Sequence, residues 1–130
     1  MAIDVFVLKD FGDQRGSSFT VPAEVLAFLG RVADVHIATV VPGSVRGNHF
    51  HLRRKEAIVV VHRAEWTLHW DDGECTAVSR RDFKEAGAEV ILVDPSHAHA
   101  VQNTGPEPLL IAAFSSEAYE PNETVARKIA

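Results

Sequence analysis

Short apolar stretches follow one another along the whole chain, and turn-forming residues separate them. The stretches are rich in β-branched and aromatic side chains, with turn signals such as PGS, DDG and NTGPEP between them. Short strands at this spacing are typical of a β-sandwich or β-barrel. The pattern therefore predicts an all-β fold, a single antiparallel β-barrel or jelly-roll-like double sheet, formed by one domain over residues 1–130. The predicted strands cover residues 3–8, 32–41, 57–61, 64–70, 75–79, 89–93, 99–103 and 109–114.

The stretch WTLHW shows the strand pattern most clearly. Trp66, Leu68 and Trp70 fall on one face of an extended chain, and the residues between them fall on the other. The DDG that follows indicates a hairpin turn. One helix is predicted at 21–30, where a proline stands in the first turn and a glycine at the end.

Composition and charge limit the location and partners of the chain. The net charge of −5 argues against a nucleic-acid partner, so any anionic ligand requires a local cluster of arginines and lysines. Cys75 is the single cysteine, which excludes an internal disulfide and is compatible with a reducing cytosol. The N-terminal sequence does not resemble a signal peptide, and no apolar run approaches the roughly 18–20 residues of a membrane-spanning helix. We therefore expect a cytoplasmic protein, and a homodimer because exposed strand edges seek partners.

Histidines are frequent, with seven in 130 residues, and four of them stand in two pairs. On a strand, residues i and i+2 point to the same face, so His49 and His51 should project together, as should His97 and His99. Glu56 adds a carboxylate five residues after His51. Imidazole and carboxylate together suit a transition metal or zinc. The alternative is a polar edge strand whose histidines face solvent.

The run VRGNHFHLRRKE resembles the first motif of the cupin family, G-x5-H-x-H-x(3,4)-E-x6-G, over residues 43–63. Gly43, His49, His51 and Glu56 match that motif, and arginine replaces its closing glycine. The second cupin motif, G-x5-P-x-G-x2-H-x3-N, is matched more loosely over residues 87–103 by a proline, by His99 and by an asparagine.

This resemblance implies a small jelly-roll-like β-barrel that binds one divalent metal ion, such as Zn, Mn, Fe or Ni. Because the second motif is shortened, His97 could take the place of His99 as a ligand or add a fifth ligand. The implied ligands are His49, His51, Glu56 and His99.

A narrower resemblance is carried by D-x-R-G at residues 13–16 and by PG-x-x-RGNHFH at residues 42–51. Both are similar to cupins that act on nucleotide-activated sugars, namely dTDP-4-dehydrorhamnose 3,5-epimerases, 3,4-ketoisomerases and the cupin domain of capsular polysaccharide reductases. Tyr119 resembles a tyrosine near the end of the ketoisomerases. The rhamnose-type epimerases have glutamine where this chain has His51, which favours a metal here.

The first hypothesis is therefore an epimerase or isomerase of a 4-keto sugar nucleotide, a small anionic substrate. The metal would polarise the ketone while a histidine removes the neighbouring proton. His97 is the expected base and Tyr119 the expected proton donor. Arg15, Arg46 and His36 are the expected substrate-binding residues, with His36 also a weaker candidate for the base.

Two other functions remain open. Three histidines and one glutamate could bind Fe(II) in a dioxygenase. A non-catalytic cupin that binds a small anionic ligand would also explain the departures from both motifs.

Overall fold

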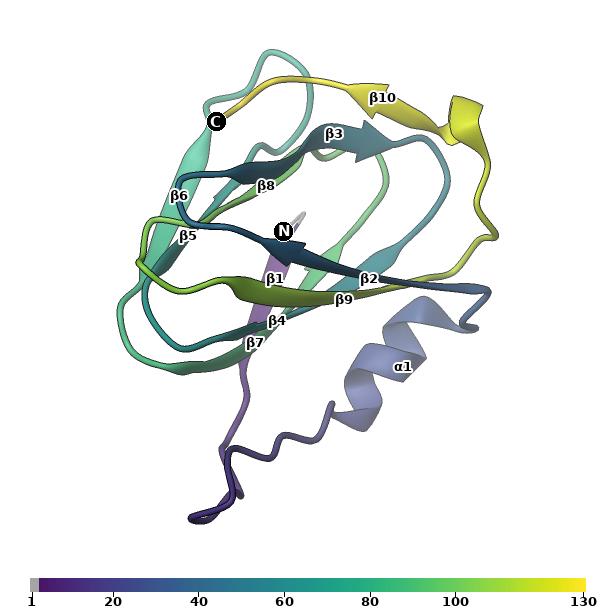
Figure 1. Ribbon diagram of the computed structural model, residues 1–130. Helices are drawn as coiled ribbons and strands as arrows, with labels where there is room; N and C mark the ends of the chain where they lie inside the picture. The colour runs from purple at the N-terminus through teal and green to yellow at the C-terminus, as the bar shows by residue number, and fades with distance from the viewer. Residues whose placement is uncertain (1–2) are drawn as a thin grey trace.

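Two antiparallel β-sheets face one another in the computed structural model of the chain, which describes residues 3–130 (Figure 1). The strands are β1 (Ile3–Val7), β2 (Asp34–Val40), β3 (Val45–His51), β4 (Glu56–His62), β5 (Trp66–Trp70), β6 (Ser79–Phe83), β7 (Gly87–Val93), β8 (His99–Gln102), β9 (Leu109–Ser115) and β10 (Thr124–Ala126). One sheet has the order β1-β7-β4-β9-β2 and the other β10-β3-β8-β5-β6. The predicted all-β double sheet is confirmed, although the first two residues of the predicted domain lie outside the described part.

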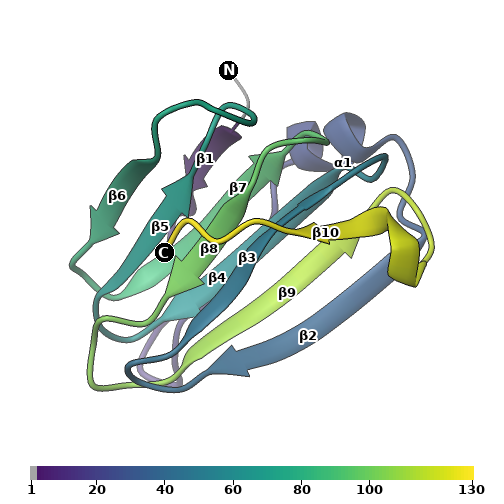
Figure 2. The ribbon, with the colours of Figure 1, turned by 90° about the horizontal axis from the view of Figure 1, so that it is seen from above.

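The main hydrophobic core fills the space between the sheets. Seen from above, the strands of the two sheets run along nearly the same diagonal (Figure 2). Trp66 and Leu68 point into this core and Trp70 packs against it, which confirms the predicted apolar face of WTLHW. Alternation along β9 is equally clear, because Leu109 is 1% exposed while Leu110 is 46% exposed. The strand period of two thus decides which side chains stabilise the fold.

A second apolar cluster lies on the outer face of the first sheet, where the helix α1 (Ala23–Leu29) covers it. Val25 and Leu29 are buried there. The helix ends at Gly30, whose φ of 75° favours glycine and whose N–H donates to the carbonyl of Leu26. The predicted helix at 21–30 is confirmed with slightly narrower bounds.

One predicted strand range was misplaced, and the predicted ranges omit β3 and β10, although the spacing argument for His49 and His51 assumes a strand at β3. Residues 75–78 do not form a strand, because Cys75 adopts a φ of 63° in a turn that Thr76 closes through its bond to Gly73. Only Ser79 of the predicted range belongs to a strand, as the first residue of β6. The pairing partner of β5 is instead β6, whose sequence SRRDF has no apolar alternation. The missed strand β10 lies in the tail, for which no period was visible.

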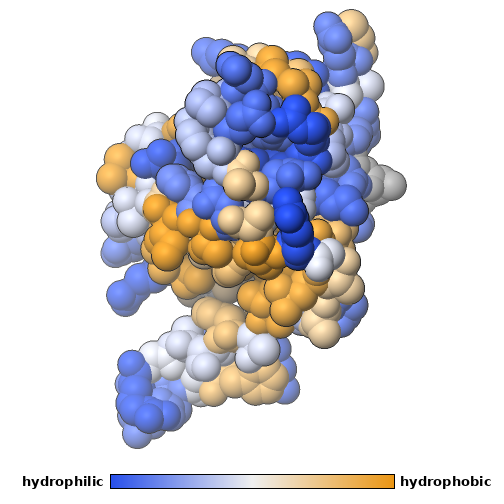
Figure 3. Space-filling view, turned by 90° about the vertical axis from the view of Figure 1, so that its right-hand side faces the viewer, coloured by the Kyte–Doolittle hydropathy of each residue, from blue (hydrophilic) through white to orange (hydrophobic). Residues whose placement is uncertain are grey.

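Part of the exposed surface is apolar. Figure 3 shows apolar surface gathered across the middle of one face, with polar surface above it. Val35 and Ile37 on the edge strand β2 are exposed. The homodimer stays a prediction. Within residues 3–130, no helix has the length and apolar character needed to cross a membrane.

Neighbouring leucines on β9 test this packing. Leu109→Ala should lower the free energy of unfolding by about 2–5 kcal/mol, since it leaves a cavity between the sheets. The matched change Leu110→Ala, on the opposite face, should cost about 0.5 kcal/mol. Urea unfolding measures both, and equal losses would contradict the assigned register.

Candidate metal centre and substrate pocket

Four polar side chains converge between the two sheets. His49 and His51 come from β3, His99 from β8 and Glu56 from β4 of the opposite sheet. One potential ligand atom of each lies within 4.8 Å of those of all the others. The structure thus brings together the four residues predicted as metal ligands, and the metal itself stays a prediction.

A β-bulge in β3 directs the two histidines of that strand. Between Gly47 and His49 the pairing with β8 shifts, so that Gly47 lies opposite Ala100 and His49 opposite His99. Gly47 has a φ of 103°, and a Cβ there would lie 2.6 Å from the carbonyl oxygen of His99. Asn48 takes up the bulge with a φ of 56°. Bulges re-aim side chains beside functional sites, and this one requires the glycine of the RGNH sequence.

The Glu56 carboxylate stands between two imidazoles. Its Oε1 lies 2.9 Å from Nε2 of His51 and 3.2 Å from Nε2 of His99. On the far side of the rings, Nδ1–H of His51 donates to Oε1 of Glu123 at 2.8 Å, and Nδ1–H of His99 donates to the carbonyl of His97 at 3.2 Å. In the neutral rings both Nε2 atoms then carry lone pairs that face a carboxylate oxygen.

The electrostatics of this arrangement favour a positive charge at its centre. Nε2 of His51 and Oε1 of Glu56 are buried, and in the described residues neither has a hydrogen-bond partner at an acceptable angle, despite their short separation. Lone pairs that converge on one point need a proton or a metal cation between them. The donor set of three imidazoles and one carboxylate fits Zn, Fe, Mn or Ni, and the outer bond from Glu123 resembles the support that metal-binding histidines commonly receive.

Protonation of the cluster is set by burial and by mutual contact. Burial and the neighbouring imidazoles of His99 and His51 lower the pKa of His49 to about 4. Burial would lower the pKa of His51, but the carboxylates of Glu56 and Glu123 outweigh it and raise that pKa. Burial would raise the pKa of Glu56, yet its contacts with His51 and His99 hold that pKa below its usual range. At neutral pH the cluster therefore holds an anionic Glu56 and a neutral His49.

Two cavities open beside the cluster, and His36, His49, Glu56 and Ala113 line both of them. The first, the Arg46 cavity, has a volume of about 150 Å³ and a largely apolar wall. The second, the Tyr119 cavity, has a volume of about 310 Å³ and extends to the C-terminal segment. Together they form a pocket whose floor is the His–Glu cluster.

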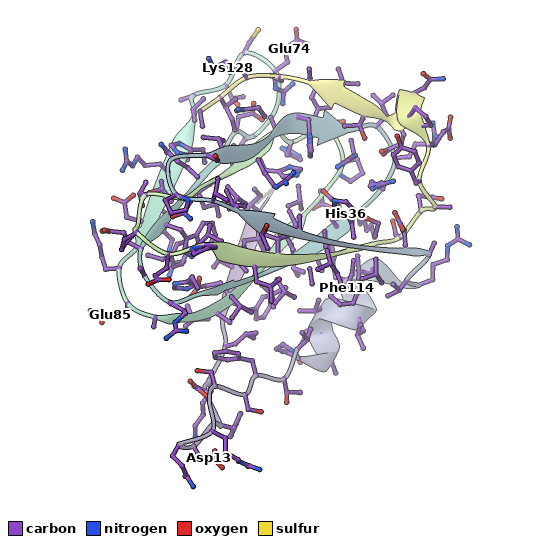
Figure 4. The ribbon with its side chains drawn as sticks, in the orientation of Figure 1. Asp13, His36, Glu74, Glu85, Phe114 and Lys128 are labelled. Carbon is purple, nitrogen blue, oxygen red and sulfur yellow. The ribbon has the colours of Figure 1, made fainter. Side chains whose placement is uncertain are left out.

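Three of the predicted substrate and catalytic residues line this pocket. His36 projects from β2 beside both cavities, and Figure 4 labels it near the middle of the molecule. Arg46 lines the first cavity, with its Nε–H donated to the carbonyl of Thr39 at 2.8 Å. Tyr119 is 71% exposed at the opening of the second.

His97 and Arg15 lie elsewhere. β8 begins at His99 and His97 lies in the turn before it, so the two-residue period of a strand does not apply to this pair. His97 lines neither cavity. Arg15 pairs with Asp13, which Figure 4 shows at the tip of a loop well away from His36. Arg15 therefore has no contact with this pocket within one chain.

Sequence reasoning missed Glu123. Glu123 is 1% exposed, and its second oxygen accepts the backbone N–H groups of Arg53 and Arg54 at 3.0 and 2.8 Å. Arg54 is also buried and lies 3.3 Å from Glu123, whereas Arg53 and Lys55 stay exposed. No spacing signal identifies Glu123, because its partner His51 is distant in the chain.

Comparison with known proteins adds a family and a shared fold. A family model described as "Polysaccharide biosynthesis C-terminal domain" matches residues 12–125. A search of curated proteins finds no match.

Three solved structures illustrate the shared fold. The 3,4-ketoisomerase QdtA from Thermoanaerobacterium thermosaccharolyticum, in complex with TDP-4-keto-6-deoxyglucose, matches with a TM-score of 0.70 and 11% identity, over 95% of this chain and 86% of that one. ChmJ, a 3′-monoepimerase from Streptomyces bikiniensis, matches with a TM-score of 0.78 and 16% identity, over 96% of this chain and 68% of ChmJ. The capsular polysaccharide assembling protein CapF from Staphylococcus aureus matches with a TM-score of 0.67 and 20% identity, over 94% of this chain and 34% of CapF. At these identities the likeness establishes the fold.

The two histidines of β3 should titrate differently in metal-free protein. His49 should stay neutral until the pH falls to about 4, whereas His51 should protonate above the ordinary value of 6.5. His49 then contributes stability above pH 6.5 that is lost as the pH falls towards 4, and His51 contributes stability below pH 6.5 that is lost as the pH rises through its raised pKa. NMR titration of the ring protons measures both, and two coincident curves near 6.5 would contradict the electrostatics described above.

Proposed function

This chain belongs to the polysaccharide biosynthesis C-terminal domain family, and we propose that it is an epimerase or isomerase of a nucleotide-activated 4-keto sugar. The observation that carries the proposal is the His–Glu cluster at the floor of a pocket with an arginine in its wall. Among its structural neighbours, QdtA is a 3,4-ketoisomerase and ChmJ a 3′-monoepimerase, which supports the same class of chemistry.

The cluster suits the removal of a proton next to a ketone. That proton is difficult to remove because negative charge develops on the ketone oxygen. A divalent metal ion held by His49, His51, Glu56 and His99 would supply Lewis-acid stabilisation of this charge. The metal is part of the proposal, and the buried, unpartnered atoms of His51 and Glu56 support it.

His36 is the base that the pocket favours. It lies on β2, outside the cluster, and lines both cavities, so it can reach a substrate bound over the four ligands. An imidazole can take up and return a proton near neutral pH. His97 lines neither cavity, so His36 replaces it in this role. Tyr119, at the opening of the second cavity, is the candidate to return a proton to another face of the sugar.

The anionic part of the substrate requires cations in a chain of net charge −5. Arg46 offers a planar guanidinium at the wall of the first cavity, anchored through one N–H to Thr39. Arg53 pairs with Glu120 and Lys55 packs over Phe28, so these two cations are engaged outside the pocket. We assign Arg46 to the diphosphate. A cytoplasmic location accords with such a substrate and stays a prediction.

Solvent deuterium exchange tests the proposal. The wild-type protein, supplied with Zn, Mn, Fe or Ni, should incorporate solvent deuterium next to the ketone of TDP-4-keto-6-deoxyglucose, observed by NMR. His36→Asn should slow this exchange by about 10²-fold or more, since it removes the base, and should retain metal.

His97→Asn is the matched control, because it changes a histidine outside both cavities. Its exchange rate should equal that of the wild type. Exchange that depends on His97 and not on His36 would reverse the assignment of the base. Tight binding of the sugar nucleotide with no exchange in the wild type would instead show a non-catalytic binding protein.

A further inference from the structure

The C-terminal segment, residues 120–130, crosses the second sheet and lies beside β3 (Figures 1 and 2). We call it the C-terminal strap. Its strand β10 pairs with the His49–His51 end of β3, and its Glu123 holds Nδ1 of His51. Besides this pairing, the strap is held by an ion pair to which the proposed chemistry assigns no role.

That ion pair joins Arg127 of the strap to Asp71 in the turn after β5. Nη2 of Arg127 lies 2.7 Å from Oδ1 of Asp71, and Nε lies 2.9 Å from Oδ2, so the contact is bidentate. Asp71 is 3% exposed, and the guanidinium also lies over the ring of Phe50 at 4.4 Å. A bidentate, shielded contact of this kind fixes the orientation of the guanidinium as well as its position.

The same pair holds the turn that precedes His99. Oδ1 of Asp71 accepts the N–H of Ala98 at 3.0 Å, and the N–H of Asp71 donates to the Ala98 carbonyl at 3.1 Å. Nη2 of Arg127 also donates to the carbonyl of Ser96 at 3.0 Å. Between these anchored residues lies His97, whose carbonyl accepts Nδ1–H of His99.

On its other side, Arg127 sets the register of the strap against the bulge in β3. Its backbone N–H donates to the carbonyl of Asn48 at 2.9 Å. The side-chain oxygen of Asn48 accepts the N–H groups of Ile129 and Ala130, so the end of the strap is tied to the residue before His49. With the strap in this register, Glu123 reaches His51 at 2.8 Å.

We infer that the Arg127–Asp71 ion pair is a clamp that positions two of the four cluster histidines at once. Through the strap it holds Glu123 against His51, and through the turn it holds the His97 carbonyl against His99. Each of these outer partners accepts a hydrogen bond from Nδ1–H, which keeps the proton on Nδ1 and leaves the Nε2 lone pair facing Glu56. Arg127 and Asp71 are thus positioning residues that touch neither the substrate nor the cluster, and their importance for metal binding rests on the function proposed above.

Two measurements on four variants test the clamp. In metal-free protein at alkaline pH, NMR of the ring nitrogens reports whether Nδ1 of His51 and His99 carries the proton. Competition with a zinc chelator reports metal affinity. Arg127→Met should mix the ring tautomers of both histidines and weaken zinc binding by about 10–100-fold. Glu123→Gln should disturb His51 and leave His99 unchanged.

Arg53→Met is the matched control, since it breaks the exposed ion pair between Arg53 and Glu120 near the same strap and alters no contact of the clamp. It should leave both tautomers and the zinc affinity within about twofold of the wild type, well below the effect of losing an outer partner. Arg127→Lys keeps the charge without the bidentate geometry and should fall between Arg127→Met and the wild type.

The outcomes separate the clamp from the proposed function. If Arg127→Met does not fold, Asp71→Asn takes its place. This variant removes the charge of Asp71, and the partly exposed guanidinium of Arg127 can then be hydrated by solvent. Unchanged tautomers of His51 and His99 in the folded variant would overturn the clamp, whatever the zinc affinity. A wild-type protein that binds no zinc or other metal would overturn the metal centre, while the tautomers of the metal-free protein would still decide on the clamp.

Discussion

The convergence of two imidazole nitrogens on one buried carboxylate oxygen is the constraint on which the site depends. In the neutral rings, His51 and His99 donate Nδ1–H to Glu123 and to a backbone carbonyl, so their Nε2 lone pairs face Glu56. A buried arrangement of this kind is costly until a proton or a metal cation stands between these atoms. That electrostatic demand, more than any single motif residue, is why we propose a metal-assisted reaction in this pocket.

The double sheet makes this convergence possible because it brings strands from opposite layers to one point. Glu56 belongs to the first sheet, and the histidines belong to β3 and β8 of the second. The glycine at position 47 allows the strands to approach, and the bulge at Asn48 directs His49 and His51 inwards. The C-terminal strap then closes the second sheet beside β3. Fold and site are therefore linked through the same few backbone positions.

The sequence predicted what depends on local periodicity. The alternation of WTLHW and the two-residue spacing of His49 and His51 are properties of one strand, and both placements are confirmed in the structure. The same argument does not apply to His97, because His97 lies in the turn before β8 and strand periodicity does not extend into a turn. Glu123 was missed because its role arises only when the tail returns to β3, a long-range contact that no local pattern encodes.

The most direct test of the account is the metal content of protein purified without a polyhistidine tag, beside Glu56→Gln and a control, His69→Asn, which changes a histidine that lines neither cavity. The account predicts about one divalent metal ion per chain in the wild type and in the control, and its loss in Glu56→Gln, since the amide cannot supply the negative charge on which the imidazoles converge. No bound metal after Zn, Mn, Fe and Ni have been offered, or equal metal in all three proteins, would contradict it.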